Sequence, residues 1–409
     1  MLDPSGPSTY PPVTVKPARH YPFLARHPWV HAASLLESRQ DHPLGTPVDL
    51  VQHDGTWLAR GLFNPQSALR VRLYSWRSGE SLDSQFFTGR IDAALSRREL
   101  AGFLPSDWRD AGLSHAKGAA RLVFSESDGL SGLIVDHYAN YLVVQLTAGV
   151  MAQQQTLLLD HLQQSLRPKA IIVRMDAKTA LKEGLEPFDQ TAYGELPQRT
   201  ISYMQNGICW AVDLQHGQKT GAFLDQRFNH AAAAKYLSDR RVLDICCYTG
   251  GFGVVAAATG AESVLGIDSS ARALELAHRN ATSNRLTNIA FAQADCFEYL
   301  ATEPSGFNAV VLDPPRFAGS RKQVAAALRA YEKLNRAALR LLPEGGVLVT
   351  NSCSGSVSRE DFLSVLSRVG KRAGRDITIL ESHAAAPDHP SRVSCPETDY
   401  LKCFICEVR

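Results

Sequence analysis

The sequence has no long hydrophobic run and no marked excess of charge of either sign. No stretch approaches the ~20 consecutive apolar residues of a membrane-spanning helix, so we expect no membrane partner. The 43 Lys and Arg residues nearly balance the 41 Asp and Glu residues. The resulting net charge of +2 excludes a histone-like polycation and an acidic tail protein, although a local basic patch would still suffice to bind a nucleic acid. The N-terminus has neither the basic nor the apolar segment of a signal peptide, so we expect a cytoplasmic protein.

Cysteine is absent from the first 208 residues, and all eight cysteines lie between Cys209 and Cys406. Disulfide-stapled secreted proteins are typically short, whereas a chain of 409 residues can bury a full core, so we expect reduced thiols. Cys403 and Cys406 form a C-x-x-C within a strand-like run. Positions three apart on a strand face opposite sides, and no second pair exists, so we expect no metal site.

The N-terminal part is predicted to contain a disordered lead-in and a small β-barrel. Five prolines and the lack of an apolar period indicate disorder over residues 1–17. Short alternating runs separated by turn signals predict a barrel over residues 18–85. Residues 1–77 carry eight Lys or Arg residues against five Asp or Glu residues, a net charge of +3. This part is therefore the one that could face phosphates, with Arg70 and Arg72 as candidate contacts, although each arginine taken alone is more often structural or a solvated surface charge.

The remaining chain is predicted to form a central α+β domain with a linking helix (86–200) and an α/β domain (201–409). In the latter, strands alternate with helices, which is typical of a doubly wound, mostly parallel sheet. The predicted parallel strands are 241–245, 263–268, 289–292, 309–312 and 346–350. Two later strands, 377–380 and 401–408, have no room for a long helix between them and predict an antiparallel hairpin at one edge.

Three aspartates end the first three strands of this sheet in order. Asp244 precedes a glycine-containing turn, whose glycines do not fit the G-x-G-x-x-G spacing of a nicotinamide-binding turn. Asp268 stands where a carboxylate binds a ribose. Asp295 is placed to accept a hydrogen bond from an adenine amino group, although strand-end aspartates are often simply helix caps. The set predicts a nucleoside cofactor without phosphates, which S-adenosylmethionine fits.

A carboxylate and a thiol follow the next two strands. Asp313 precedes Pro314 and Pro315, which cannot continue a β-ladder and so fix the loop. Cys353 follows the fifth strand. Neighbouring strands lie ~4.8 Å apart, so we expect Asp313 and Cys353 to line one pocket.

This pair suits methylation at carbon 5 of a pyrimidine. A thiolate that adds to carbon 6 makes carbon 5 nucleophilic, and a nearby carboxyl group holds or protonates the ring nitrogen. A base then removes the carbon 5 proton, and the thiol is eliminated. The alternative is that Cys353 is a small buried hydrophobic residue.

The chain resembles the bacterial large-subunit ribosomal RNA cytosine-5 methyltransferases over nearly its whole length. The segments that carry the resemblance are 26–30, 126–136, 216–227, 388–390 and 396–402. It implies an N-terminal PUA domain, a central domain and a class I methyltransferase domain. It also implies that Cys353 is the nucleophile, and that the loop with Lys219 and Thr220 borders the methionine end of the cofactor. The implied cofactor positions are Asp244, Tyr248, Thr249, Gly250, Asp268, Ser269, Asp295 and Asp313.

The resemblance implies formation of 5-methylcytosine in large-subunit ribosomal RNA by a monomer or homodimer. Other RNA cytosine-5 enzymes place a second Cys where this chain has Arg316, which we expect to contact RNA. The alternatives are an RNA uracil-5 methyltransferase, a guanine-N methyltransferase, and an inactive RNA-binding ribosome assembly factor.

Overall fold

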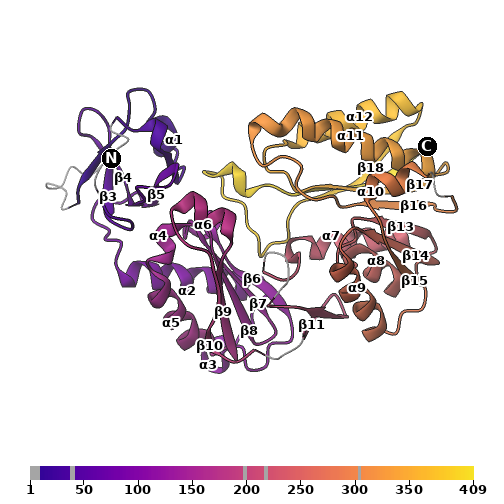
Figure 1. Ribbon diagram of the computed structural model, residues 1–409, viewed down its shortest axis with the longest axis horizontal. Coiled ribbons are helices and arrows are strands. Elements are labelled where there is room, and N and C mark those ends of the chain that lie inside the picture. The colour runs from indigo at the N-terminus through magenta and orange to yellow at the C-terminus, as the bar shows by residue number, and fades with distance from the viewer. Residues whose placement is uncertain (1–9, 37–41, 197–199, 216–219, 303–304) are drawn as a thin grey trace. The chain divides into compact units, whose positions relative to one another are not determined.

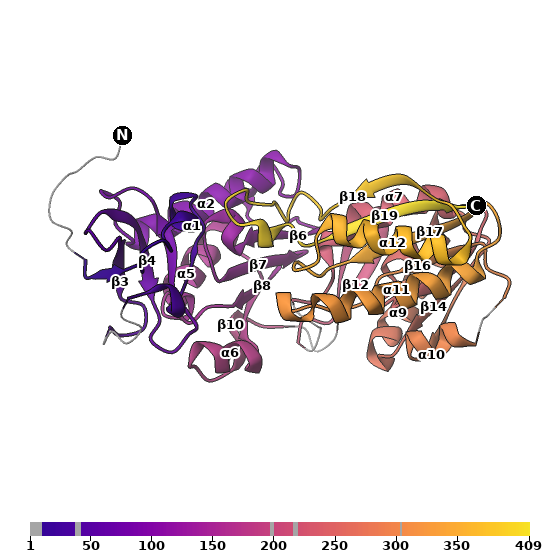
Figure 2. The same cartoon turned by 90° about the horizontal axis from the view of Figure 1, so that it is seen from above.

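The computed structural model describes residues 10–36, 42–196, 200–215, 220–302 and 305–409. The chain forms two compact units (Figures 1 and 2). The first comprises residues 1–199, 214–220 and 388–398, and the second comprises residues 200–213, 221–387 and 399–409. Within the described ranges, none of the helices combines the length and the apolar character needed to cross a membrane.

The first unit begins with a five-stranded sheet in the order β1-β3-β4-β5-β2. Its strands are β1 (Pro12–Thr14), β2 (Trp29–His31), β3 (Pro47–Val51), β4 (Trp57–Phe63) and β5 (Leu69–Ser75), with a short helix α1 (Tyr21–Leu24). The alternating residues predicted to form strands do so, and Val48, Leu50 and Val71 lie in its core. The predicted lead-in extends too far, because Val13 is fully buried and β1 pairs with β3.

A second five-stranded sheet follows in the same unit, in the order β10-β9-β8-β7-β6. Its strands are β6 (Ala119–Phe124), β7 (Leu133–Tyr138), β8 (Tyr141–Leu146), β9 (Ala170–Met175) and β10 (Phe188–Gly194). The helices are α2 (Ser84–Leu100), α3 (Trp108–Ala111), α4 (Gly149–Ala152), α5 (Gln155–Leu166) and α6 (Ala177–Glu183). Helices α2 and α5 bury Ile91 and Leu162 with strand residues such as Val144 in one core.

The second unit contains a hairpin of β11 (Ile201–Gln205) and β12 (Ile208–Val212), followed by a seven-stranded sheet. The sheet order is β15-β14-β13-β16-β17-β19-β18, in which β13 to β17 are parallel and β18 and β19 pair antiparallel, as predicted. The strands are β13 (Arg241–Ile245), β14 (Ser263–Asp268), β15 (Ile289–Gln293), β16 (Ala309–Leu312), β17 (Gly346–Ser352), β18 (Ile377–His383) and β19 (Lys402–Val408).

Helices cover both faces of this sheet (Figure 1). They are α7 (Arg227–Leu237), α8 (Gly251–Ala258), α9 (Ala271–Ser283), α10 (Cys296–Ala301), α11 (Val324–Leu341) and α12 (Arg359–Ala373). Residues of α10, α11 and α12 share one core with the sheet, and residues of α7 and α8 share another. The loops that follow the parallel strands therefore meet at one edge of a sheet held rigidly between two helical layers.

Candidate active site

The candidate nucleophile Cys353 follows β17, next to the strand that ends before Asp313. Strands β16 and β17 are parallel, with Leu312 opposite Thr350, so their following loops leave the same edge of the sheet. The half-buried Cys353 thiol donates a hydrogen bond of 3.7 Å to the main-chain carbonyl of Pro314. The structure thus brings the Cys353 side chain onto the loop that begins with Asp313.

One phenol connects the two residues that flank Cys353. The buried hydroxyl of Tyr331, on α11, accepts a 3.0 Å hydrogen bond from the Ser352 hydroxyl and lies 3.1 Å from that of Ser354. Burial raises the pKa of Tyr331 to about 12, so this phenol is neutral at physiological pH. Cys353 is therefore held on both sides.

A buried ammonium holds the loop that follows Cys353. Nζ of Lys402 donates hydrogen bonds of 2.9, 2.7 and 2.9 Å to the main-chain carbonyls of Ser354, Val357 and Tyr400. All three of its donors are thus in use. Burial lowers the pKa of Lys402 to about 8, an effect opposed by the negative charges of Asp399 and of a Cys353 thiolate. The cation is therefore both a clamp on the loop and a positive charge beside the candidate nucleophile.

Asp313 is oriented by a chain of side-chain amides. Gln226 Nε2 donates to Asp313 Oδ1 at 3.0 Å, and Asn229 Nδ2 donates to Gln226 Oε1 at 2.5 Å. Gln226 and Asn229 are both buried. Because the Gln226 amide presents its N–H to the carboxyl group, it favours one rotamer of the half-buried Asp313.

Asp244 is fully buried at the end of β13. Its Oδ2 accepts a 2.8 Å hydrogen bond from the amide of Gly253, whereas its Oδ1 has no hydrogen-bond partner among the described residues. Burial raises the pKa of Asp244 to about 7, despite the opposing effect of the Gly253 amide. A Cβ atom at Gly253 would lie 2.9 Å from Asp244 Oδ2, so the glycine permits the close approach of α8. The orphaned buried oxygen suits a donor on a bound cofactor.

Asp268 organises the turn between β13 and α8. Its Oδ2 accepts a 2.9 Å hydrogen bond from the Tyr248 amide, and its Oδ1 accepts one of 2.9 Å from the Ser270 amide. Tyr248 and Gly250 both have positive φ values, +49° and +86°. Asp268 thus fixes the main chain of the turn through two amides. Its half-buried carboxylate can still accept hydrogen bonds from ribose hydroxyls.

The remaining predicted cofactor positions differ in their surroundings. Asp295 Oδ1 caps α10 by accepting from the amides of Phe297 and Glu298, the simple role that strand-end aspartates often have. Ser269 is exposed, and the Thr249 carbonyl accepts a 2.9 Å hydrogen bond from the Asn280 side chain. These residues stay predicted cofactor contacts.

The predicted methionine-end loop lies mostly outside the described residues, and this includes Lys219. Thr220 is buried in the first unit, where its hydroxyl donates to Asp136 Oδ2 and lies 3.4 Å from the Tyr138 hydroxyl. Its side chain is thus engaged by the central sheet of that unit.

Comparisons with known proteins match both regions of the chain. Residues 13–76 match the model of a PUA-like domain, and residues 237–381 match that of a methyltransferase domain. "Ribosomal RNA large subunit methyltransferase I" of Escherichia coli (strain SMS-3-5 / SECEC) is 37% identical over 397 residues, which is 95% of this chain and 97% of that protein. The same-named protein of Escherichia coli O157:H7 (strain EC4115 / EHEC) is 36% identical with equal coverage. The chain belongs to this family.

Solved structures agree on the fold. A methyltransferase complexed with SAH has a TM-score of 0.82 at 20% identity, covering 97% of this chain and all of that one. An S-adenosylmethionine-dependent methyltransferase from Streptococcus mutans has a TM-score of 0.81 at 18% identity, with the same coverage. The predicted class I methyltransferase fold with a preceding PUA-like domain is confirmed, and family membership with the methyltransferase domain makes S-adenosylmethionine the cofactor.

The predicted RNA-binding arginines of the PUA-like domain are engaged by the protein itself. Arg72 is buried, lies 3.4 Å from Glu126 and 3.5 Å from Glu183, and donates to the Ser131 hydroxyl at 3.0 Å. Arg70 is half-buried and donates to the Asn64 carbonyl at 3.1 Å. Arg72 joins the PUA-like sheet to the central domain, so we do not retain it as an RNA contact.

Arg316 differs from those two arginines. Its guanidinium is exposed, and its Nε donates a 2.8 Å hydrogen bond to the Ala318 carbonyl within the same loop. It remains a predicted RNA contact beside the candidate active site.

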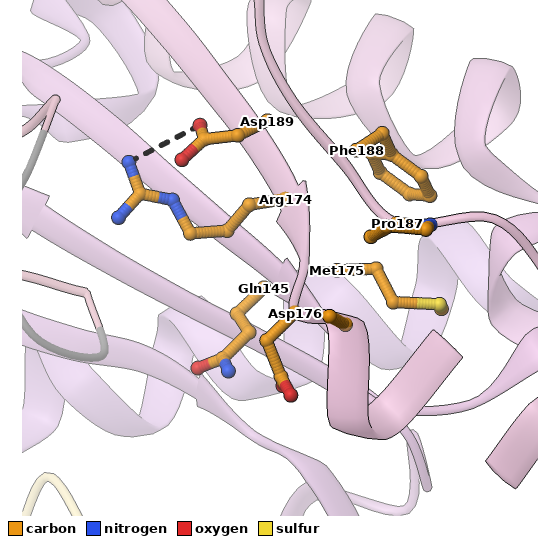
Figure 3. Close-up of a pocket in the computed structure, with 8 residues that line it drawn as sticks. Gln145, Arg174, Met175, Asp176, Pro187, Phe188 and Asp189 are labelled. Carbon is orange, nitrogen blue, oxygen red and sulfur yellow. Dashed lines mark ion pairs between the residues drawn. The ribbon is translucent and has the colours of Figure 1, made fainter. Parts of the chain in front are cut away.

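A pocket of about 560 Å³ lies in the central domain (Figure 3). It is lined by Gln145, Arg174, Met175, Asp176, Ala177, Pro187, Phe188 and Asp189. Arg174 pairs with Asp189 at 3.4 Å, and Asp176 caps α6 by accepting from the Thr179 amide. Its charged groups therefore already have protein partners.

One group of metal-ligand side chains occurs in the described part of the first unit. The ligand atoms of His27, Cys395 and Glu397 lie within 4.8 Å of one another. The Trp29 amide donates to His27 Nδ1 at 3.3 Å, which leaves Nε2 as the N–H that faces Glu397 at 3.2 Å. This tautomer forms a hydrogen-bonded His–Glu pair rather than offering a lone pair to a metal.

Sequence reasoning missed Gln226, Tyr331 and Lys402 as supports of the candidate pair. Gln226 and Lys402 lie in segments that carried the family resemblance, which was the only signal they gave. Tyr331 lies in an amphipathic helix, and its position is indistinguishable from that of any core residue until α11 is packed on the sheet.

Proposed function

We propose that this chain methylates carbon 5 of a cytosine in large-subunit ribosomal RNA through a covalent bond from Cys353 to carbon 6. The observation that carries the proposal is the contact between the Cys353 thiol and the Asp313-Pro314 loop, at 3.7 Å, at the sheet edge that also carries Asp244 and Asp268. A thiol serves no purpose in methylation of a guanine nitrogen. This placement therefore favours a pyrimidine over a guanine target.

The residues divide the chemistry between them. S-adenosylmethionine supplies an electrophilic methyl group when bound. The Cys353 thiolate forms a bond to carbon 6, and the electron pair of the carbon 5–carbon 6 double bond moves to carbon 5. The Asp313 carboxyl group holds the ring nitrogen and, carrying a proton, donates it as negative charge develops there. After the methyl group has joined carbon 5, a base takes the carbon 5 proton, and the electron pair of that C–H bond restores the double bond and expels Cys353 as thiolate.

The surroundings of Cys353 support this role. A free thiol has a pKa of ~8.5, so a nucleophilic Cys needs a nearby positive charge or base. The Lys402 ammonium supplies a positive charge, and Tyr331 and Lys402 fix the residues on both sides of Cys353. A Cys that served only to fill space would not need these polar supports.

The test is nucleoside mass spectrometry of unmodified large-subunit ribosomal RNA after incubation with labelled S-adenosylmethionine. We expect 5-methylcytidine with the native chain and none with Cys353→Ala. Cys209→Ala is the matched control, because Cys209 is also half-buried but lies in the β11–β12 hairpin. Detection of 5-methyluridine or methylated guanosine would show that the target base is uracil or guanine and not cytosine. RNA binding without methylation would support the assembly-factor alternative.

A second measurement tests the covalent step. RNA with 5-fluorocytidine at the target cannot lose a proton from carbon 5, so the bond between Cys353 Sγ and carbon 6 should persist. We expect a protein–RNA adduct that survives denaturation and maps to Cys353 by mass spectrometry. An adduct on another cysteine would show that this other cysteine is the nucleophile.

The cytoplasmic location and the monomeric or dimeric state stay predictions.

A further inference from the structure

A row of cationic side chains runs along the exposed face of α11. Arg329, Lys333, Arg336 and Arg340 are all exposed. Their spacing of four, three and four residues returns to the same face of a helix. At 1.5 Å per residue, the row extends over about 16 Å. We call Arg329, Lys333, Arg336 and Arg340 the α11 stripe.

Two arginines of the α11 stripe, Arg329 and Arg336, have no acidic partner among the described residues. Within the described parts of the chain, Arg329 and Arg336 have no carboxylate within 4.0 Å, and Lys333 Nζ lies 4.8 Å from the Phe297 ring centroid. The one acidic residue of α11, Glu332, pairs instead with two arginines of the neighbouring helix α12. Arg329 and Arg336 therefore keep their charges available to a ligand.

The sequence around the α11 stripe is strongly basic compared with the chain as a whole. Residues 316–376 carry twelve Lys or Arg residues against five Asp or Glu residues, a net charge of +7 in a chain of net +2. Residues 221–300, which form α7, α8 and α9, carry seven against eight. The segment that contains α11 and α12 is therefore strongly positive, whereas the segment that contains α7, α8 and α9 is nearly neutral.

The stripe is connected in the chain to the candidate active site. The loop that begins at Asp313 leads through exposed Arg316, Arg321 and Lys322 into α11. Helix α11 then runs back along the sheet from the edge where β16 ends. In the chain, the exposed cations thus follow one another from the loop after Asp313 into α11.

We propose that the α11 stripe binds the phosphates of the RNA strand that carries the target base, which deepens the proposed function and rests on it. A single small anion is bound by donors that converge on one point. These cations are instead spread along a line, which suits a polyanion with regularly repeated charges. A membrane surface fits less well, because the exposed large hydrophobic side chains of the described residues include none from α11.

The test compares two double variants of the full chain with equal loss of charge. Arg329→Gln with Arg336→Gln removes two charges from the stripe. Lys235→Gln with Arg279→Gln removes two exposed charges from α7 and α9, on the other face of the sheet. We would measure the dissociation constant for unmodified large-subunit ribosomal RNA by filter binding over a series of NaCl concentrations.

Each lost phosphate contact lowers the slope of log affinity against log salt by roughly 0.7–0.9. We therefore expect the slope of the stripe variant to fall by roughly 1.5 and its affinity to fall about tenfold at low salt. Its KM for RNA should rise while kcat is kept. The control variant should match the native chain, and both should melt at the native temperature because the replaced side chains are exposed.

A native slope in the stripe variant, or an equal loss in the control variant, would overturn the proposal. Loss of binding to vesicles containing anionic lipid, with RNA binding intact, would also overturn it and assign the stripe to a membrane surface. If the native chain itself bound RNA without salt dependence, the proposed function would fail first, so the two failures are distinguishable.

Discussion

Lys402 donates a 2.9 Å hydrogen bond to the carbonyl of Ser354, the residue that follows the candidate nucleophile Cys353. The same ammonium holds the carbonyls of Val357 and Tyr400, so one buried cation connects the start of β19 with the loop after β17. Ser352 lies opposite Lys402 in the β17–β19 register, which places the cation beside this loop.

Replacing Lys402 should affect both stability and rate. Lys402→Met leaves three carbonyls without their donor, and each lost partner of a buried group costs roughly 1–3 kcal/mol. We expect a lower Tm and at least a tenfold lower kcat, with cofactor affinity kept. The reaction of Cys353 with iodoacetamide should shift to higher pH, because the nearby positive charge is gone. An unshifted alkylation profile would restrict Lys402 to a purely mechanical role.

Gln226 should act on the rate through Asp313. Gln226→Met keeps the length of the side chain but removes the amide that donates to Asp313 Oδ1. We expect roughly a tenfold fall in kcat with little change in KM for RNA, since the carboxyl group loses its orientation but is still present. Asp313→Asn should cost more, and a Gln226→Met variant with native kcat would contradict the positioning role.

The buried carboxyl group of Asp244 should make the stability of the cofactor-free chain depend on pH. Its folded-state pKa, about 7, lies above the ordinary value of 3.8. Its contribution to the free energy of unfolding is thus greatest below pH 4 and is lost as the pH rises to 7. The Asp244→Asn variant should lack this loss. The difference in free energy of unfolding between the variant and the native chain should therefore grow in favour of the variant by about 2–4 kcal/mol from pH 5 to pH 8. Urea denaturation at the two pH values checks this, and equal gains at both would contradict it.

Asp268 should be required both for the conformation of the turn after β13 and for binding of S-adenosylmethionine. Asp268→Ala leaves the Tyr248 and Ser270 amides without their acceptor and removes the predicted ribose contact. We expect S-adenosylmethionine affinity to fall by about one to two orders of magnitude, as for the loss of a charged hydrogen-bonding group worth roughly 1.5–3 kcal/mol. Isothermal titration calorimetry measures this. Asp295→Ala provides the comparison. A larger loss of S-adenosylmethionine affinity in that variant would show that Asp295, and not Asp268, is the more important carboxylate for cofactor binding.

Arg72 should stabilise the first unit rather than bind RNA. Arg72→Met leaves Glu126 and Glu183 buried without their cation, a type of change that typically costs 3–5 kcal/mol. We expect a clearly lower Tm, whereas the salt dependence of RNA binding should be native at temperatures where the variant is folded. A reduced salt slope with native stability would restore Arg72 as a phosphate contact.

The sequence by itself determined the order of the elements and the ends of three of the five parallel strands, whereas β15 and β17 extend one and two residues beyond the predicted 289–292 and 346–350. The predicted strands 241–245, 263–268 and 309–312 match β13, β14 and β16 at both ends. The strand ends at Asp268 and before Asp313 could be predicted because buried apolar runs stop there at a polar residue or proline, which is a local signal.

The tertiary structure decided which polar residues support the site and which surface is basic. Lys402, Gln226 and Tyr331 approach the candidate pair from distant segments, and no local pattern separates them from ordinary core or strand residues. Charge counted along the chain pointed to residues 1–77, but folding buried Arg72 in ion pairs and placed the cations of α11 in one exposed row. Composition records how many charges a segment has, whereas burial, pairing and the helical repeat decide which of them reach solvent.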